Sequence, residues 1–489
     1  MSFRFPRFFG PGAALSVFVS AALIFSLPAH AQVLDNDIGS SPNIRVGTPL
    51  PPKPSSKTTV PPFSHPEAIF TNPFGIQTWL RDHGINILLD NTNEFAGAIT
   101  PPTKGNPRFV SYKQGASNAG QYADELDIDW DKLAGIRGLA THMITVGRYG
   151  TTANRMFGDW LNHSSEDYGG GGNVVVHLVL AYAEETLLGG RIALAAGRMP
   201  EVSDFAASSL FCNFMNNSMC GRPKGITDSN FSPGYPASTW AFRARFRPTR
   251  LTYAQFGVYP MENGVYAVAQ HRTGFKFNGS NIIGFTVPLE IGVEPLFGNG
   301  SLPGHYKLGV SLLDEQQPDN LFDSFGDLYA LSGRSQRMHG AGYSSWGMFD
   351  QRLVHFKNGG KDSGITALTG VVYNDPHTSV RQWEGYVAFL DRGFWPSRPF
   401  DTIGLAFTYT RIAPGVTLTD QLLLEEGKAL PNHATGVQSH AEILEANYAI
   451  HVMRGVIFQP VFEYYFNPNG QDNLRNAAML GFKSHVEFF

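Results

Sequence analysis

Residues 240–259 read WAFRARFRPTRLTYAQFGVY and join two alternating segments through the turn Pro248-Thr249-Arg250. The first segment alternates apolar and cationic side chains, with Phe242, Ala244 and Phe246 set against Arg243, Arg245 and Arg247. Side chains of a β-strand point alternately to its two faces, so this segment predicts one apolar and one triply cationic face. A soluble core accounts for the apolar face but leaves the aligned arginines unexplained. Lipid on one side and a water-filled lumen on the other account for both.

The same two-residue period recurs from Gly84 to the end of the chain. Clear examples are residues 85–90, 126–130, 283–293, 306–312, 403–409 and 456–466. About sixteen strands can be placed between Gly84 and Phe489 by this alternation. Each of these strands is expected to have one apolar face.

The predicted connections alternate in length. Short joins are predicted at residues 133–136, 188–190, 248–250 and 452–455, and long ones at residues 100–121, 149–172, 199–236, 314–340 and 412–436. An outer-membrane barrel is built in this way, with tight periplasmic turns and long extracellular loops. We therefore predict an all-β fold, a transmembrane antiparallel β-barrel of about sixteen strands.

The composition agrees with a barrel. A length of 489 residues would suit roughly two to four soluble domains or one large barrel. Charged residues make up 16% of the chain, below the usual quarter, and aromatic residues make up 13%. After residue 31 no apolar run reaches the roughly 18 residues that a transmembrane helix needs. The sequence therefore argues against a helical membrane protein.

The N-terminus predicts export. Residues 1–31 are typical of a secretory signal peptide, because a basic start precedes an apolar run and the tripeptide AHA at 29–31. A membrane anchor is the alternative, but the apolar run is too short for one. Cleavage would remove Arg4 and Arg7 and so lower the formal net charge of −4 by two, which argues against nucleic-acid binding. Residues 32–70 are proline-rich and are expected to be flexible, and residues 71–489 to form the barrel.

Charged strand residues predict where a pore would be narrow. An arginine on the lipid face costs about 2–4 kcal/mol at the midplane, so Arg243, Arg245 and Arg247 are expected to face the lumen. Other charged residues expected to face inward are Glu290, Glu125, Asp127 and Asp129. Guanidinium groups and carboxylates can exchange hydrogen bonds with sugar hydroxyls. The alternative is that these charges only form ion pairs that hold the wall and loops in shape.

The sequence offers little for catalysis. Its 15 histidines include no His-Glu-x-x-His pattern, and no nucleophile elbow is present. Glu201 with Asp204, or Asp127 with Asp129, would be the acid pair of a glycosidase. Acidic residues on a water-facing wall explain them more simply. We therefore predict no enzymatic activity, no cofactor and no metal site.

The chain has 2 cysteines, Cys212 and Cys220, which lie in one predicted loop. A disulfide between them suits the oxidising compartment that a signal peptide implies. A metal site is the alternative and would need further ligands. A loop stiffened in this way can fold back into a pore, so residues 199–236 and the arginine row are expected to form two sides of its narrowest zone.

Two stretches resemble the OprB-type carbohydrate-selective porin family. The first comprises AGR at 196–198, DFA at 204–206, FCNF at 211–214, NN at 216–217, CG at 220–221, YP at 235–236, STW at 238–240 and QFGVY at 255–259. The second comprises EANY at 445–448, QPVFEY at 459–464 and NPNG at 467–470. With the general layout, the resemblance covers most of residues 70–489.

The resemblance implies a barrel in the outer membrane of a Gram-negative bacterium, as a monomer or homotrimer. Family members admit glucose and other small carbohydrates by diffusion, without a cofactor or catalysis. Arg198 and Asp204 lie within the matching text and join Arg243 and Arg245 as constriction candidates. Two departures stand out. NPFGI at 72–76 replaces a Gly-Asp-Trp-Gly-Gly-type segment, and the terminal phenylalanine is out of phase with the alternation of residues 480–488.

We therefore predict a porin for passive, carbohydrate-selective diffusion, with small sugars and outer-membrane lipid as its partners. The first alternative is a general or anion-favouring porin, because of the arginine row. The second is a secreted β-rich carbohydrate-active enzyme, which would be soluble without detergent.

Overall fold

The structure is a computed structural model that describes residues 68–70, 72–100, 115–166, 175–230, 234–262, 273–275, 282–357, 360 and 362–489. The predicted signal peptide and nearly all of the proline-rich segment lie outside the described residues, as does part of the predicted 100–121 loop.

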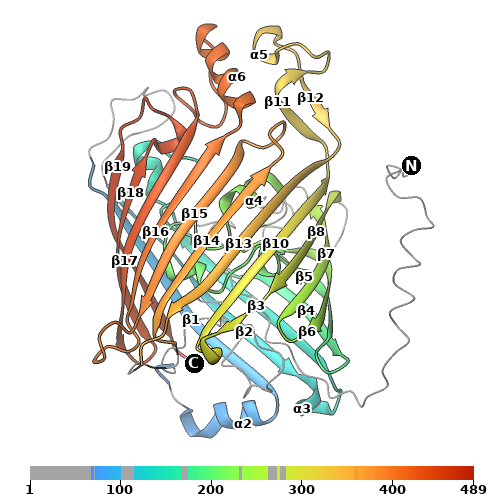
Figure 1. Cartoon of the computed structure of the whole chain (residues 1–489), viewed down its shortest axis with the longest axis vertical. Coiled ribbons are helices and arrows are strands. Elements are labelled where there is room, and N and C mark those ends of the chain that lie inside the picture. Colours follow the sequence, from blue (N-terminus) through green and yellow to red (C-terminus); the bar gives the residue numbers. More distant parts are fainter. Residues whose placement is uncertain are drawn as a thin grey trace, which may run out of the picture.

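Sixteen long strands form the wall of the molecule (Figure 1). They belong to a 17-stranded sheet whose other member, β9 (Leu296–Phe297), has 2 residues. Each long strand pairs antiparallel with the next, and the last pairs with the first, so the predicted barrel is confirmed. The wall strands are β1 (Ile85–Ala98), β2 (Ala116–Asp129), β3 (Leu139–Gly150), β4 (His177–Leu187), β5 (Ile192–Met199), β6 (Thr239–Thr249), β7 (Thr252–Glu262), β8 (Ile282–Val293), β10 (Leu302–Asp314), β13 (Gly342–Val354), β14 (Gly364–Asn374), β15 (Arg381–Arg392), β16 (Thr402–Ile412), β17 (His440–Met453), β18 (Val456–Phe466) and β19 (Ala477–Glu487).

The wall is apolar outside and polar inside. On β8, Leu289 and Ile291 are 42% and 58% exposed, whereas Glu290 between them is 3% exposed. On β6, Phe246 is 49% exposed and Arg245 is 5% exposed. The two-residue period of the sequence carries this arrangement around the barrel. Soluble proteins place apolar side chains inside and polar ones outside. The reverse arrangement seen here is the one that a lipid bilayer requires.

The two ends of the barrel differ in their connections (Figure 1). At one end lie short joins, at residues 188–191, 250–251 and 454–455, together with α2 (Ile76–Asp82) and α3 (Trp130–Ala134). The other end carries longer connections, with the hairpin of β11 (Gln317–Asp323) and β12 (Gln336–His339), α5 (Tyr329–Ser332) and α6 (Pro414–Glu425). An exception at this end is the short join at residues 375–380. The predicted asymmetry is otherwise confirmed.

Strand β2 differs from the prediction at its start. It begins at Ala116, so residues 116–121, expected in a loop, belong to the wall. These residues are small or polar and hide the alternation. On the outer face, the Asn118 amide exchanges hydrogen bonds of 2.7 and 2.8 Å with the Asn93 amide of β1, which satisfies both groups.

Strand β2 also ends one residue early. Trp130, expected in the strand, begins α3 because the Asp129 carboxylate accepts the backbone N–H groups of Asp131 and Lys132, at 3.0 and 3.4 Å. Such a cap is typical of a helix N-terminus. Asp129, expected to line the lumen, is thus a capping residue at the end of the barrel.

Helix α6 begins at Pro414, a favoured residue for the first helical turn, within a connection that the sequence predicted only as a loop. Among the described residues, no helix is long and apolar enough to cross a membrane.

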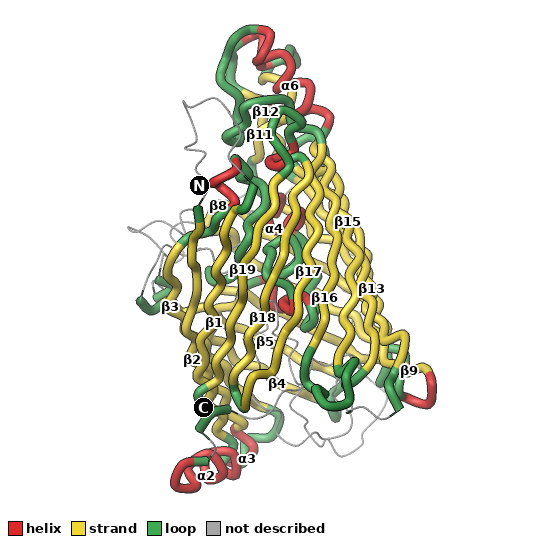
Figure 2. The backbone as a smooth tube through the Cα atoms, turned by 90° about the vertical axis from the view of Figure 1, so that its left-hand side faces the viewer, coloured by secondary structure: helices red, strands yellow, loops and turns green. Residues whose placement is uncertain are grey.

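The connection between β5 and β6 turns into the barrel and is called here the infolded loop (residues 200–238). It contains η3 (Glu201–Ser203), η4 (Phe211–Asn213) and α4 (Lys224–Asn230). Helix α4 and its neighbouring chain lie between opposite walls in both views (Figures 1 and 2). Phe205, Leu210 and Phe214 are fully buried in a cluster that includes the wall residues Leu180 and Leu368. The infolded loop therefore fills part of the barrel interior, so the barrel is not an open tube.

Candidate pore constriction

Arg243 of β6 fastens the infolded loop to the wall. Its guanidinium forms ion pairs with Glu184 of β4 and with Asp204 of the loop, the latter at 2.5 Å. The second Asp204 oxygen accepts the hydroxyl of Tyr259 on β7, at 3.0 Å. Arg243, Glu184 and Asp204 are all buried or nearly so. Two predicted constriction residues are therefore brought together, but as a closed ion pair.

Arg247 is also neutralised within the wall. Its two terminal nitrogens bind both carboxylate oxygens of Glu294, at 2.8 and 3.3 Å. Such a two-point contact between guanidinium and carboxylate fixes orientation as well as charge. The guanidinium also lies 5.3 Å from the ring centre of Tyr253.

Arg245, between these two, differs from both. Its Nε donates to the Gln255 side chain at 2.8 Å, and its guanidinium lies 5.7 Å from the Tyr253 ring centre. Within the described part of the chain, no carboxylate lies within ion-pair distance of Arg245. Of the arginine row, Arg245 is thus the residue whose charge no carboxylate of the described residues neutralises.

Glu290 of β8 joins three strands and the infolded loop. One oxygen accepts Tyr253 Oη at 2.9 Å and Gln255 Nε2 at 3.0 Å. The other accepts Trp346 Nε1 at 2.9 Å and the backbone N–H of Ala206 at 3.0 Å. Its hydrogen-bonding capacity is used within the protein, so Glu290 acts here as an anchor.

Arg198 lies apart from this group. It stands opposite Trp240 in the ladder of β5 and β6, whereas Arg243 stands opposite Ala195. Its guanidinium is 3.7 Å from Glu262 and donates to the Ser238 carbonyl. Arg198 therefore braces the point where the infolded loop returns to the wall.

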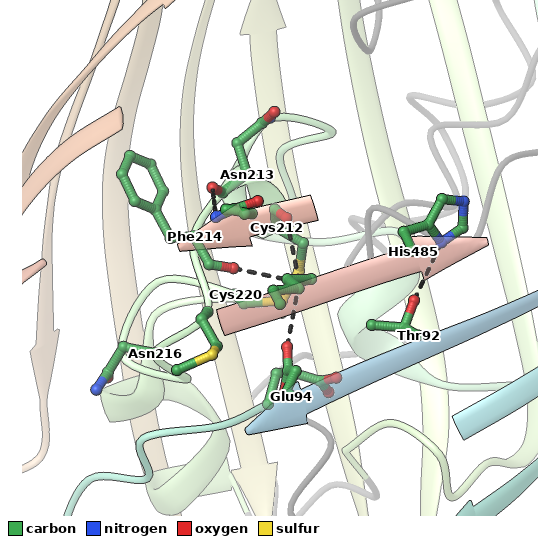
Figure 3. A network of polar contacts seen from close by, with 12 residues as sticks. Thr92, Glu94, Cys212, Asn213, Phe214, Asn216, Cys220 and His485 are labelled. Atoms are coloured by element: carbon green, nitrogen blue, oxygen red, sulfur yellow. Dashed lines mark hydrogen bonds and ion pairs between the residues drawn. A yellow bond between two sulfur atoms is a disulfide. The ribbon is translucent and has the colours of Figure 1, made fainter. Parts of the chain in front are cut away.

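The disulfide of Cys212 and Cys220 lies beside the seam where the barrel closes (Figure 3). Lys483 of β19 pairs with Glu94 of β1 at 3.2 Å. The same ammonium donates to the carbonyls of Cys212 and Phe214, both at 3.4 Å. One lysine thus ties the first strand, the last strand and the infolded loop together.

Glu445 of β17 holds the next part of the infolded loop. Its carboxylate accepts the backbone N–H groups of Met215 and Asn216, each at 2.9 Å. The Asn216 amide in turn donates to Glu463 at 3.2 Å and to Tyr465 at 2.6 Å. Glu445 and Glu463 stand in the sequence stretches 445–448 and 459–464, yet their role was missed because alternation shows only that they face inward.

Helix α4 is held by β15. Glu384 accepts the backbone N–H of Lys224 at 2.9 Å and that of Gly225. Arg381 binds the Asp228 carboxylate at 2.7 Å. Burial opposes ionisation of Asp228, but Lys224 and Arg381 outweigh it and lower the pKa of this carboxyl.

Each member of the acid pairs considered for catalysis has another partner within the protein. Glu201 lies 3.5 Å from Arg222, and Asp204 pairs with Arg243. Asp127 contacts His142 at 2.7 Å. Across the residues that the structure describes, no group of three His, Cys, Asp or Glu side chains is placed to hold a metal ion.

The family model described as carbohydrate-selective porin, OprB family, matches residues 113–488. The chain belongs to this family. Porin B of Pseudomonas aeruginosa is 24% identical over 382 residues, which cover 76% of this chain and 82% of that protein. The high-pH structure of Pseudomonas putida OprB shares the fold with a TM-score of 0.78 and 24% identity, covering 87% of this chain and 99% of that one. The low-pH structure gives a TM-score of 0.51 and 17% identity over 87% of this chain and 100% of that one.

Membership of this family shows in which membrane the barrel lies. This carbohydrate-selective porin lies in the outer membrane of a Gram-negative bacterium, with its short turns on the periplasmic side and its long connections outside. Its relatives are porins, which are channels rather than enzymes.

Proposed function

We propose that this porin lets glucose and other small sugars diffuse passively into the periplasm and performs no chemistry on them. The observation that supports this most directly is the infolded loop, which narrows the lumen and is fastened to β8, β15, β17 and β19. A passage narrowed by fixed side chains selects by size and by hydrogen bonding.

The chemistry of the narrow zone suits uncharged, hydroxyl-rich solutes. Arg245 has no carboxylate partner among the described residues, whereas the neighbouring Arg243 and Arg247 are neutralised by carboxylates. Guanidinium donors bind hydroxyl oxygens without the full attraction that a row of three free charges would exert on anions. Of the three predicted arginines, Arg245 is therefore the one that we propose to bind sugar hydroxyls.

Liposome swelling with sugars of graded size tests the proposal. Purified porin in vesicles should admit monosaccharides quickly and larger oligosaccharides slowly, and the cut-off reports the diameter of the passage. Vesicles that swell no faster than protein-free vesicles in glucose would refute sugar permeation. Hydrolysis of an added oligosaccharide would refute the absence of catalysis.

An anion-favouring porin is the second candidate, and Arg245 is the observation that favours it. Reversal potentials across planar bilayers under a salt gradient measure the preference directly. A strong anion preference that glucose leaves unchanged would support this candidate over the first.

The mature protein is proposed to begin at Gln32, after removal of residues 1–31, and to work as a monomer or homotrimer in outer-membrane lipid. Intact mass measurement of the exported protein tests the first statement, since any other N-terminus changes the mass. Native mass spectrometry from detergent tests the second, and a dimer would contradict it.

A further inference from the structure

An aromatic side chain is held at the extracellular mouth by two separate connections. Trp160 lies between β3 and β4, and its backbone N–H donates to the Asn469 side chain at 3.1 Å. The next residue, Leu161, is bound through its carbonyl by Arg381 of β15. These contacts fix the ring between the β3–β4 and β18–β19 connections, beyond the constriction residues.

Two exposed side chains lie against the Trp160 ring. The His433 ring stacks on it, with centroids 4.0 Å apart and planes inclined by 21°. The Arg155 guanidinium lies 4.4 Å from the ring centre. Within the described residues, Arg155 has no carboxylate partner, and the covered Nε1 of Trp160 makes no hydrogen bond. A buried donor left unpaired gains free energy when an acceptor reaches it.

The chain that carries His433 is strained at this point. Asn432 and His433 are consecutive residues with φ of 55° and 56°, in the left-handed region that side chains other than glycine rarely adopt. Strain of this kind is often found at ligand clamps, where the surrounding structure holds it. Movement of the His433 ring away from Trp160 would uncover the indole.

We propose that Trp160 and Arg155 form a carbohydrate-capturing subsite at the extracellular mouth, and that His433 covers it until a sugar arrives. The inference rests on the proposed sugar permeation. A pyranose has a flat face of C–H groups that suits the negative face of an indole ring. Arg155 supplies donors for the sugar hydroxyls, and Trp160 Nε1 gains the acceptor that it lacks. His433 occupies the indole as a sugar ring would.

Glucose block of ion current through single porins in planar bilayers tests the subsite. Glucose is added on the side of the long loops, and the half-blocking concentration is measured. Trp160→Ala should raise this concentration about three- to tenfold, the loss expected for one aromatic stack. Trp160→Phe should restore most of the block. Trp395→Ala, in the β15–β16 turn at the other end of the barrel, is the matched control and should behave as the parent does.

His433→Ala sharpens the test because it should act in the opposite direction. Removing the cover should lower the half-blocking concentration about twofold or more, since no competing contact must first be broken. A merely structural stack would instead make His433→Ala and Trp160→Ala weaken binding together. Heat-modifiable mobility on denaturing gels shows that each variant has folded. If Trp160→Ala does not fold, Trp160→Leu serves instead, because it fills the space without an aromatic face and should weaken the block in the same way.

The outcomes separate this inference from the proposed function. If glucose permeates the parent, and blocks the ion current of the parent and of Trp160→Ala equally well, the subsite alone is overturned. A parent that glucose neither enters nor blocks overturns both. Equal block by His433→Ala and the parent, with Trp160→Ala weakened, overturns the covering role of His433.

Discussion

The wall and the infolded loop are held by different kinds of interaction. In the wall, each strand satisfies its backbone through its neighbours, and side chains need only alternate between an apolar and a polar face. The infolded loop has little regular structure, so wall side chains bind its backbone instead. Glu290, Glu384 and Glu445 accept its N–H groups, while Lys307 and Lys483 bind its carbonyls. Inward-facing charged side chains in this porin therefore supply the hydrogen bonds that regular secondary structure would otherwise give the infolded loop, and they also line a passage.

The largest expected effect concerns Arg243, where the two regions meet. Arg243→Ala leaves the buried carboxylates of Glu184 and Asp204 without their shared cation. Removal of one partner from a buried ion pair costs about 3–5 kcal/mol, so the free energy of unfolding should fall by that amount. Urea titration of the porin refolded in vesicles measures the loss.

Arg411→Ala provides the control for this comparison. Arg411 lies at the exposed outer end of β16, and a surface substitution of this kind changes stability by less than about 0.5 kcal/mol. If Arg243→Ala is no more harmful than Arg411→Ala, Arg243 is not an anchor of the infolded loop.

The outer wall provides the next effect in size. Leu289→Arg places a charge on the apolar face of β8, where Leu289 is 42% exposed. Arginine facing lipid costs about 2–4 kcal/mol near the midplane and less near the interfaces. Refolding into vesicles should be weakened accordingly, whereas Leu289→Val should fold normally. Normal stability of Leu289→Arg would mean that this face meets water or protein and not lipid.

The difference between the regions also explains what could be predicted from the sequence. Strand alternation placed Arg243, Arg245 and Arg247 on the inner face of β6, because a two-residue period follows from backbone geometry alone. It could not show that Arg243 and Arg247 are neutralised while Arg245 is not, since Glu184 comes from β4 and Glu294 is the residue that follows β8. Partners that are distant in sequence leave no periodic signal.

The helices show the same limit on a smaller scale. The cap of α3 depends on the Asp129 side chain, which has the same residue type and parity as lumen-facing acids. Helix α6 lies in a connection that has no strand partner to set its pattern. Both helices form because of local side-chain and backbone chemistry, which the alternation of apolar and polar residues does not reveal.

Glu445 tests whether the wall holds the infolded loop through its backbone. Glu445→Ala leaves the N–H groups of Met215 and Asn216 without their acceptor, which costs about 1–3 kcal/mol. The loop should then leave its place, so single-channel conductance should rise and protease should cut the loop more readily.

Glu442→Ala is the matched control, because Glu442 lies on the same strand but on its outer face. Its conductance and protease resistance should equal those of the parent. Equal conductance of Glu445→Ala and Glu442→Ala would contradict the anchoring role of Glu445.

The smallest effect on stability, and the sharpest on selectivity, is expected at Arg245. Arg245→Ala removes one hydrogen bond to Gln255 and leaves no buried carboxylate unpaired, so stability should fall by about 1 kcal/mol or less. The lumen loses a charge that no carboxylate neutralises in the described structure. The reversal potential under a salt gradient should therefore shift toward cations, whereas Arg245→Lys should keep the parent value. If Arg245→Ala conducts anions as the parent does, the accessible charge of the constriction lies elsewhere, and Arg245 belongs with Arg243 and Arg247 as part of the wall.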